Sequence, residues 1–540
     1  MRRFDYIVIG AGSAGCAVAA RLSEDPAVSV CLIEAGAKDT SPLISIPLGF
    51  MRLFDHKTLN WRFTTAPQTH AAGRTIPVPR GKVLGGSSSI NGMVYTRGHP
   101  GDYDDWARLG NPGWSFREVL PYFRRSENNE DFPDSPYHGK GGPLNVKFLD
   151  SYNPLSEVLF EAAESLQYRR NADFCGATHE GFGRRQFTQI RGRRHSAARA
   201  FIAPALGRPN LTVLTDTPVR RIVIEEGRAT GVEIGSAGGG ETIAADREVV
   251  LSAGVIGSPQ ILMLSGIGEA SQLAAHGIAL KHHLPGVGKN YRDHIVGVVQ
   301  YTSPTTVPYG LSWRTVPWAA WSVLQYALFR TGIFANAPGH SGGFIRTLPE
   351  LTRPDVQFIL IPAFRDRKGR TGIGHGFGLM TIVLRPESRG EVRLASADPA
   401  ADPVIDPQFF SRPEDVDTMV RGLRIGRRLL SAPAFDPYRG VETDPGEAVT
   451  TEGEWQDFAR RTASTGFHPV GTCKMGNDPE AVVDAQLRVH GVAGLRVADA
   501  SIMPTLVGGN TNGPSIMIGE KAADMILGRP PLPPAAVRTA

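Results

Sequence analysis

The sequence lacks several features that would assign it to well-defined protein classes. Its 540 residues include four cysteines and no Cys-x-x-Cys pair, so neither a metal site nor a redox dithiol is predicted. So few cysteines in a long chain favour a reducing compartment. No run of about 18 apolar residues is present, so no membrane-spanning helix is expected. We also find no internal repeat.

The chain also has little net charge. It has 58 basic and 53 acidic residues, which leave a formal net charge of +5. Without a nucleic-acid motif, nucleic-acid binding is not expected. The densest basic cluster could meet an anionic surface or substrate, although a solvated face is the interpretation we favour. The cluster consists of Arg184, Arg185, Arg191, Arg193, Arg194 and His195.

The most apolar segment of the chain, residues 316–329, is predicted to be a helix bracketed by arginines. With Trp313, Trp318 and Trp321 it could lie in a membrane interface. We favour a core or substrate-lining helix, which is the usual meaning of an apolar helical face. No apolar signal segment precedes the first predicted strand. We therefore expect a cytoplasmic protein, with peripheral membrane contact and the oligomeric state left open.

The first 33 residues predict a β-α-β unit. Residues 4–9 are apolar enough for a buried strand, residues 14–24 show helical spacing, and residues 28–33 predict a second strand. Two such strands should be parallel, with a right-handed crossover.

A glycine-rich motif, Gly10-Ala-Gly-Ser-Ala-Gly15, joins this strand to this helix. Gly10 permits a tight turn, Gly12 lets the backbone approach a pyrophosphate, and Gly15 allows close helix–strand packing. Glu34 ends the second strand, where a carboxylate can accept hydrogen bonds from ribose hydroxyls. The motif predicts a dinucleotide site without separating FAD from NAD.

The rest of the chain predicts an α/β protein with a Rossmann-like cofactor domain and a substrate domain built on an antiparallel sheet. Three parts form the cofactor domain: residues 1–150, 206–295 and 456–528. Residues 151–205 are expected to connect the domains and to contribute to the substrate domain, residues 296–455. Residues 529–540 are expected to be a disordered tail. Further predicted elements are a helix over 154–168, strands over 211–214, 219–226, 248–252, 355–361 and 376–384, and a helix from about 257.

Two further segments carry chemistry. Residues 81–98 contain three serines beside a double glycine, which offer hydroxyl and N–H groups to phosphate or flavin oxygens. Near the other end, His468 is followed by Gly509-Asn-Thr-Asn-Gly-Pro-Ser515. An imidazole can take a proton from an alcohol, and the amide of Asn512 can hold the developing alkoxide. Together with a redox cofactor, these groups describe alcohol oxidation.

These motifs, together with residues 254–268 and Leu495–Ser501, closely resemble the glucose–methanol–choline family of FAD-dependent oxidoreductases. The resemblance runs from Asp5 to about Lys521. Residues 59–61, 92–99 and 509–514 are most similar to bacterial choline dehydrogenases and to alcohol dehydrogenases of alkane-type degradation.

The resemblance implies a role for each matching position. His468 corresponds to the active-site histidine near flavin N5, and Asn512 to the second active-site position. Val219 matches a residue whose backbone contacts adenine. Asp499 and Ala500 match a segment near the ribityl chain and pyrophosphate. The FAD contacts expected are Gly10, Gly12, Ser13, Ala14, Gly15, Glu34, Ala35, Gly85, Gly86, Ser87, Asn91, Gly92, Met93, Val94, Val219, Asp499, Ala500 and Asn510.

Two departures from the family pattern are informative. Ile90 stands where some members carry the histidine that attaches FAD covalently, so noncovalent FAD is expected. His340 stands where choline-type members carry a glutamate, before Ser341-Gly-Gly-Phe344. A histidine there would pair poorly with a fixed cation. If His340 lines the substrate pocket, it argues against choline and for a neutral or weakly polar alcohol.

The predicted activity is FAD-dependent oxidation of a primary alcohol to an aldehyde, with His468 as base and hydride transfer to flavin N5. Electrons would pass to a quinone or another carrier. Three alternatives stay open: an oxidase that uses O2, a choline dehydrogenase, and a flavoprotein with a non-redox role. A simple NAD dehydrogenase is disfavoured because the later motifs would have no purpose.

Overall fold

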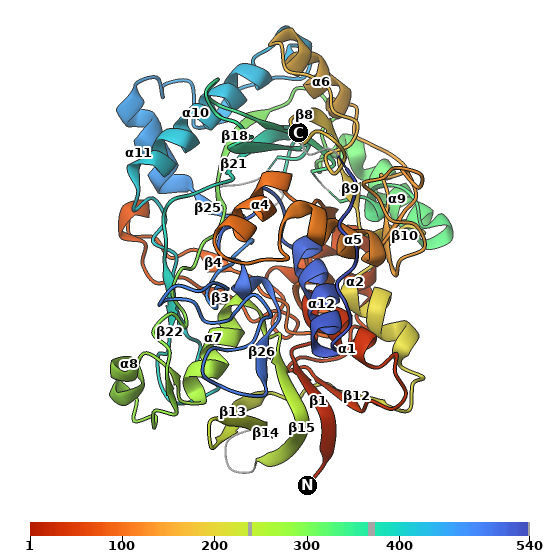
Figure 1. Cartoon of the computed structure of the whole chain (residues 1–540). Coiled ribbons are helices and arrows are strands. Elements are labelled where there is room, and N and C mark those ends of the chain that lie inside the picture. Colours follow the sequence, from red (N-terminus) through yellow and green to blue (C-terminus); the bar gives the residue numbers. More distant parts are fainter. Residues whose placement is uncertain (236–239, 338, 365–372, 538–540) are drawn as a thin grey trace.

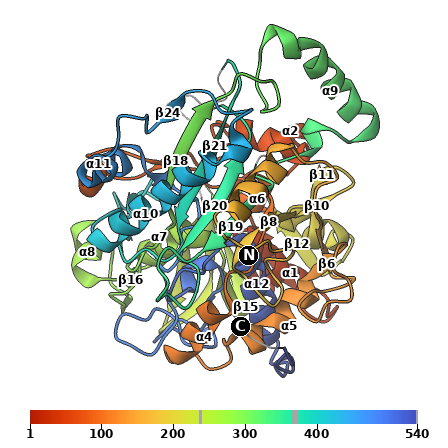
Figure 2. The same ribbon diagram turned by 90° about the horizontal axis from the view of Figure 1, so that it is seen from above.

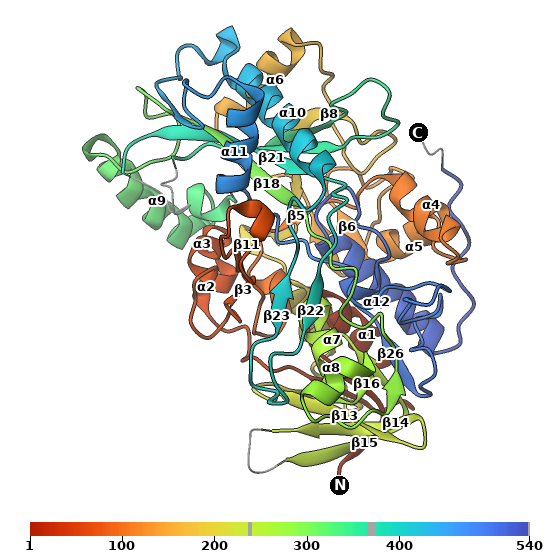
Figure 3. The same cartoon turned by 90° about the vertical axis from the view of Figure 1, so that its left-hand side faces the viewer.

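Two seven-stranded sheets organise the part of the chain that the structure describes, residues 1–235, 240–337, 339–364 and 373–537. The structure is a computed structural model. In Figure 1 the first sheet lies at the bottom and the second at the top. Figure 3 shows the same arrangement from the side, with β22 (Glu391–Arg393) and β23 (Val404–Asp406) running between the two.

The first sheet contains the β-α-β unit predicted at the start of the chain. Helix α1 (Ser13–Leu22) joins two strands that pair in parallel. Helix α12 (Asn512–Ile526) packs against α1, and the close approach needs Gly519, whose Cβ would lie 2.4 Å from the Ala14 carbonyl oxygen. The strands in spatial order are β12 (Leu211–Leu214), β2 (Val30–Ile33), β1 (Arg3–Ile9), β15 (Glu241–Leu251), β14 (Arg228–Ile234) and β13 (Val219–Glu225), with β26 (Leu495–Val497) beside β15.

The second sheet is antiparallel, as predicted for the substrate domain. Its central strands are buried on both faces. Helix α10 (Pro413–Leu430) packs on it together with α6 (Leu155–Ser165), and α11 (Glu452–Thr462) packs against α10. The strands are β24 (Glu442–Asp444), β18 (Ile295–Thr302), β21 (Gly376–Val383), β20 (Val356–Ile361), β19 (Ser341–Ile345) and β8 (Gly181–Arg184), with β25 (Ser464–Thr465) beside β18. The α/β fold class is therefore confirmed.

Short helices and strands occur within residues 40–150, and further small elements lie elsewhere. The helices are α2 (Pro42–Ser45), α3 (Phe50–Leu53), α4 (Pro100–Arg108), α5 (Phe116–Ser126), α7 (Gly254–Leu264) and α8 (Ala270–Ala275). The strands are β3 (Phe63–Thr64), β4 (Pro77–Val78), β5 (Val94–Tyr95), β6 (Glu127–Asn129), β7 (Leu144–Val146), β9 (Gln186–Phe187), β10 (Gln189–Ile190), β11 (Arg193–Arg194), β16 (Ile267–Gly268) and β17 (His282–His283).

The domain boundaries predicted from the sequence do not all match the sheets. Strand β8 comes from residues 151–205, which are expected to contribute to the substrate domain, and it forms an edge of the second sheet. Strand β25 lies in the segment assigned to the cofactor domain, yet it pairs with β18. The final segment is not a free tail in its described part, because Ala535 donates its N–H to the Arg117 carbonyl (2.7 Å) and is buried.

Helix α9 (Val316–Phe329) differs most from its predicted role. Only Ser322 and Tyr326 are buried in it, so the core-helix interpretation is wrong. The helix projects from the molecule at the upper right of Figure 2 and at the left of Figure 3. In the described residues, no helix has the length and apolar character needed to cross a membrane.

Candidate active site

One long cavity extends from the first sheet to the second. At the first sheet it is lined by Gly10 and Glu34, which follow the carboxyl ends of β1 and β2. At the second sheet it is lined by Ile359, Ile361 and Met380. Crevices at the carboxyl ends of parallel strands are where α/β proteins bind dinucleotides.

The glycines of the β1–α1 turn have the roles predicted for them. Gly10 has φ +93°, a conformation that favours glycine, and its Cβ would lie 2.5 Å from the Ser252 carbonyl oxygen. A Cβ on Gly15 would lie 1.9 Å from the Gly10 carbonyl oxygen. A Cβ on Gly12, by contrast, would meet no atom within 4 Å and would point into open space. That space and the N-terminus of α1 form a cradle that suits a pyrophosphate.

Two buried carboxylates face the same cradle. Glu34 accepts hydrogen bonds from the N–H groups of Ala11 (3.0 Å) and Gly36 (2.8 Å), and burial raises its pKa to about 7. Asp499 accepts hydrogen bonds from the Gly254 N–H (2.9 Å) and the Ser258 hydroxyl (2.6 Å), and burial raises its pKa. The two carboxylates, the Gly12 cradle and the serine-rich segment are donors and acceptors that fit FAD.

The serine-rich segment is fixed from behind by a buried arginine. Arg194 Nη1 donates to the Ser88 carbonyl (3.1 Å) and to Asn91 Oδ1 (2.8 Å). Burial lowers the pKa of Arg194 to about 9. The interpretation of the 184–195 basic cluster as a solvated face is therefore wrong for Arg194 and for Arg185, both of which are buried.

Most residues predicted to hold the cofactor line this cavity. Gly15 and Gly85 do not line it. Gly15 packs against the β1–α1 turn, and Gly85, with φ +92°, forms a turn before the serines. Ile90 also lines the cavity. The predicted residues that line it are Gly10, Gly12, Ser13, Ala14, Glu34, Ala35, Gly86, Ser87, Asn91, Gly92, Met93, Val94, Val219, Asp499, Ala500 and Asn510.

His468 lies on the return segment between the sheets and lines the cavity. Its backbone N–H donates to Asp293 Oδ1 (2.9 Å), which fixes the loop. Its Nδ1 lies 2.9 Å from His294 Nδ1, and its Nε2 lies 2.8 Å from Asn510 Nδ2. Burial, followed by the charges of neighbouring groups, holds the pKa of His468 well below its usual range. The imidazole is therefore neutral at neutral pH.

The neighbours of His294 determine which nitrogen of His468 carries the proton. His294 Nε2 lies 3.1 Å from two carbonyl oxygens, those of Leu384 and Val507, so Nε2 must be the donor. Burial lowers the pKa of His294 to about 4, so its Nδ1 is bare and accepts a hydrogen bond. His468 must then donate through Nδ1, which leaves its Nε2 lone pair facing Asn510.

The two asparagines of the terminal motif lie in different surroundings. Asn510 donates to His468 Nε2 through Nδ2 and accepts from Arg185 Nη2 (2.9 Å) through Oδ1. Asn512 begins α12, and its Oδ1 accepts from the Ser13 hydroxyl (2.7 Å). The structure thus places Asn510 beside His468, whereas Asn512 joins α12 to α1 on the cofactor side.

His340 is not among the residues that line the cavity. Its Nε2 accepts the Asn153 N–H (3.0 Å), and the Tyr152 ring packs on it edge-on. Its side chain is buried in the wall behind the site, so the prediction of a pocket role is not supported by its position.

Sequence reasoning missed Asp293, His294, Arg80 and Arg185. Asp293 and His294 form an adjacent acid–imidazole pair just before β18, a signal that could have been weighed. Arg80 lines the cavity and donates to the Phe467 carbonyl (2.7 Å). Arg185 gave no separate signal because it stands within a run of basic residues.

The fold and the cavity define a dinucleotide-binding oxidoreductase with a base and an amide donor at its reacting end. Two models of GMC oxidoreductases match residues 4–296 and 386–519, which is most of the chain. The chain belongs to the GMC oxidoreductase family, whose members bind FAD.

The similarity to known members extends over nearly the whole chain. It is 44% identical to an alcohol dehydrogenase [acceptor] of Pseudomonas putida, covering 97% of this chain and 96% of that protein. It is 44% identical to an oxygen-dependent choline dehydrogenase of Sinorhizobium fredii, covering 98% and 96%. The structure of pyridoxine 4-oxidase from "Mesorbium loti" superposes with a TM-score of 0.88 at 32% identity, covering 98% and 100%.

Proposed function

We propose that the protein oxidises a primary alcohol to an aldehyde with FAD. The observation that carries this proposal is the convergence of two groups on the cavity: the Nε2 lone pair of His468 and the amide N–H of Asn510. An alcohol hydroxyl that displaces the Asn510 N–H from His468 Nε2 meets a proton acceptor there, and its oxygen can accept a hydrogen bond from the Asn510 amide. The family and the names of its similar members support the same reaction class.

Each group has a defined task in the proposed reaction. His468 Nε2 takes the hydroxyl proton as the alcohol is oxidised. The Asn510 N–H that does not face His468 stabilises the developing alkoxide. His294 keeps the second His468 proton on Nδ1, and Asp293 holds the loop through the His468 backbone. FAD, when bound, would supply the acceptor for the hydride that leaves the alcohol carbon.

The cofactor is proposed to be bound without a covalent link. Glu34 and Asp499 would hold the ribose and the pyrophosphate–ribityl region, with Gly12 leaving room for the phosphates. Ile90 faces the cavity where some family members carry a histidine, and an aliphatic side chain cannot form that bond.

Three alanine variants of the holoenzyme test the assignment. H468A should retain FAD and slow anaerobic flavin bleaching by an alcohol ~10²–10⁴-fold, the usual range of general-base catalysis. N510A should slow it ~10²–10³-fold through loss of an oxyanion donor. N512A should lose FAD more readily but reduce at nearly the wild-type rate per bound flavin. If N512A slows reduction and N510A does not, the assignment of Asn510 is wrong.

The electron acceptor is proposed to be a quinone or another carrier rather than O2. The support is the similarity to an alcohol dehydrogenase [acceptor]. Oxygen consumption with alcohol, measured with and without an artificial quinone, tests this directly. If the alcohol causes oxygen uptake, and adding the quinone neither lowers that uptake nor speeds alcohol turnover, the protein is an oxidase instead.

A membrane surface is the partner we propose for α9. Among the described residues, sixteen large hydrophobic side chains are exposed, and ten of them belong to residues 311–329 or to Ile373 beside them; Trp313 is 81% exposed. Arg314 and Arg330 flank the helix, which contains no acid. Tryptophans with flanking cations suit the interface of an anionic bilayer. The four cysteines are all free and buried, so we place the protein on the cytoplasmic side.

Co-sedimentation with lipid vesicles tests this contact. The holoenzyme should sediment with phosphatidylglycerol vesicles and much less with phosphatidylcholine vesicles. Replacing Trp313, Trp318 and Trp321 with serine should abolish sedimentation without loss of FAD, because these side chains do not line the cofactor cavity. Self-association that disappears in the same variant, without vesicle binding, would identify a second copy as the partner.

A further inference from the structure

Arg185 carries a buried positive charge at the substrate end of the cavity. It lies between β8 and β9, is 3% exposed and lines the cavity beside Asn510. Its Nη2 donates to Asn510 Oδ1 (2.9 Å) and its Nη1 to the Gly339 carbonyl (3.2 Å). Both acceptors are neutral. A guanidinium has five N–H donors, so these two bonds do not exhaust it.

No carboxylate pairs with Arg185 within the described ranges. The acids that line the cavity lie at its other end: Glu34 and Asp499 at the glycine cradle, and Asp402 in a loop held by α7 through Gln260 and the Ala401 carbonyl (2.9 Å). Burial alone lowers the pKa of Arg185, to about 9, which leaves the side chain charged at neutral pH. A buried cation without a protein counter-charge is costly, and a bound anionic group would offset that cost.

The charge of Arg185 also reaches the reacting groups. After burial and the neighbouring His294, the charges of Arg80 and Arg185 contribute to the lowered pKa of His468. Burial lowers the pKa of Arg80 as well, but the nearby charge of Asp293 opposes this shift, whereas Arg185 has no such acid. The remaining substrate-end lining from the second sheet is apolar: Ile359, Ile361 and Met380.

We propose that Arg185 sets the charge selectivity of the substrate end, so that it accepts alcohols with a carboxylate or a neutral group beside the guanidinium and rejects cationic alcohols. This inference rests on the proposed alcohol oxidation. It assigns the exclusion of quaternary ammonium alcohols to Arg185 and not to His340. The pocket then combines an apolar wall with one cation, an arrangement suited to a hydroxy acid or an uncharged alcohol.

Pairs of substrates that differ only in charge test the proposal. Choline and 3,3-dimethylbutan-1-ol have the same shape, as have 4-hydroxybutanoate and 4-hydroxybutanamide to a good approximation. Wild-type enzyme should favour the neutral member of the first pair and the anionic member of the second in kcat/KM. In R185M the preference should shrink about 10-fold to 100-fold, the size expected for unit charges at this range in a protein. R185K, which keeps the charge, should retain the preference.

A binding measurement covers the case in which R185M loses turnover because Asn510 is no longer held. The flavin spectrum of the oxidised holoenzyme should be perturbed by pivalate in wild type and R185K, but not in R185M, and by tetramethylammonium in none of them at the same concentration. Equal preference in wild type and R185M, with equal pivalate binding, would overturn the proposal. Failure of every alcohol to bleach the flavin, with pivalate binding intact, would instead count against the proposed reaction alone.

Discussion

At the scale of single residues, the site depends on the direction of its hydrogen bonds as much as on the identity of its groups. Arg185 donates to Asn510, Asn510 donates to His468, and His468 donates to His294. His294 in turn donates to two backbone carbonyls. Every proton in this chain has one position, because its last acceptors are carbonyl oxygens that cannot donate. The basic nitrogen of His468 is therefore the one that faces the cavity.

Two variants of His294 separate its positioning role from its structural role. In H294N, an oxygen near the former Nδ1 can still accept from His468, so we expect near-wild-type flavin reduction but a lower Tm, because the two carbonyls lose their donor. In H294Q, a donor near the former Nε2 is kept but the acceptor is lost, so Tm should hold while reduction slows about 10²-fold. Stopped-flow reduction and thermal unfolding measure the two effects.

A control and a contrary outcome sharpen this test. The pH profile of kcat/KM should be unchanged in H294N and altered in H294Q, because only the latter frees the His468 tautomer. Parallel losses of rate and Tm in both variants would show that His294 acts by packing alone.

The residue scale is also where sequence reasoning was least able to place the site. Asn510 and Asn512 are equivalent in the sequence motif, and only the start of α12 shows which one faces His468. Arg185 belongs to a segment about 280 residues away from His468 in the sequence and resembles its solvated neighbours. The tertiary fold buries Arg185 between β8 and β9, and no local sequence pattern indicates that burial.

At the scale of elements, the sequence predicted the β-α-β unit because its signals are local. The apolar runs of the two strands, the glycine positions and the Glu34 carboxylate all lie within about 35 residues. Local signals did not predict the exposure of α9, because the sequence of an apolar helix does not indicate whether its apolar face packs in a core or lies at a surface. Local signals failed for residues 529–537 as well, because Ala535 is held by Arg117 of α5, which is distant in the sequence.

Two glycines of the β1–α1 turn give a matched prediction. G12V adds a side chain in open space, so the apoprotein should fold with an unchanged Tm, yet the side chain should occupy the phosphate position and abolish FAD binding. G15V forces a Cβ to within 1.9 Å of a carbonyl oxygen and should destabilise the fold by about 1–3 kcal/mol or more. Unfolding of the apoproteins and FAD titration distinguish the two. If G12V binds FAD normally, the pyrophosphate does not bind in this cradle.

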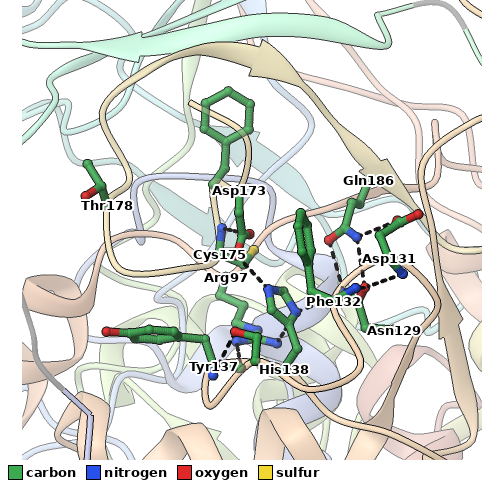
Figure 4. Close-up of polar contacts among 12 residues, drawn as sticks. Arg97, Asn129, Asp131, Phe132, Tyr137, His138, Asp173, Cys175, Thr178 and Gln186 are labelled. Carbon is green, nitrogen blue, oxygen red and sulfur yellow. Dashed lines mark hydrogen bonds and ion pairs between the residues drawn. The ribbon is translucent and has the colours of Figure 1, made fainter. Parts of the chain in front are cut away.

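A second element-scale feature is the buried polar network around Arg97 and His138 (Figure 4). His138 Nδ1 faces Glu127 (2.9 Å) and its Nε2 faces Asp173 (3.0 Å), so both nitrogens meet a carboxylate. Burial opposes the charged form, but the two carboxylates prevail and raise the pKa of His138. Glu127 also pairs with Arg97, and the network joins β6 to the loop before β8.

The raised pKa of His138 determines how the free energy of unfolding changes with pH. Protonated His138 stabilises the fold fully below its ordinary pKa of 6.5, and this stabilisation disappears as pH rises through the higher folded-state pKa. The unfolding free energy of wild type should therefore exceed that of H138Q by about 3 kcal/mol at low pH, and the gap should narrow in alkaline solution. Denaturant titrations at several pH values measure it. H70Q, at an exposed histidine, should show no such gap. If the stability difference between wild type and H138Q widens as pH rises, protonated His138 does not stabilise the fold.

At the scale of the whole molecule, the cofactor cavity unites segments that are remote in sequence. It is lined by the β1–α1 turn, the serine-rich segment, the start of α7 and the two terminal motifs, with strands of the second sheet at its far end. Filling it should stabilise both sheets together. The order of the motifs is legible in the sequence, but their convergence on one cavity depends on packing between the sheets, as the pairing of β25 with β18 shows.

The cavity leads to a last prediction, on the release and return of FAD. Because Ile90 offers no covalent attachment, acid precipitation should leave the yellow cofactor in the supernatant. The apoprotein should melt below the holoenzyme, and free FAD at 100 times its Kd should restore about 2.7 kcal/mol of stability. ADP should restore only part of it, since it fills the cradle of the first sheet and leaves the end beside His468 empty. Calorimetry of the apoprotein with each ligand measures these shifts. Yellow colour that remains in the acid pellet would show a covalent link, and full restoration by ADP would show that the flavin end adds nothing to stability.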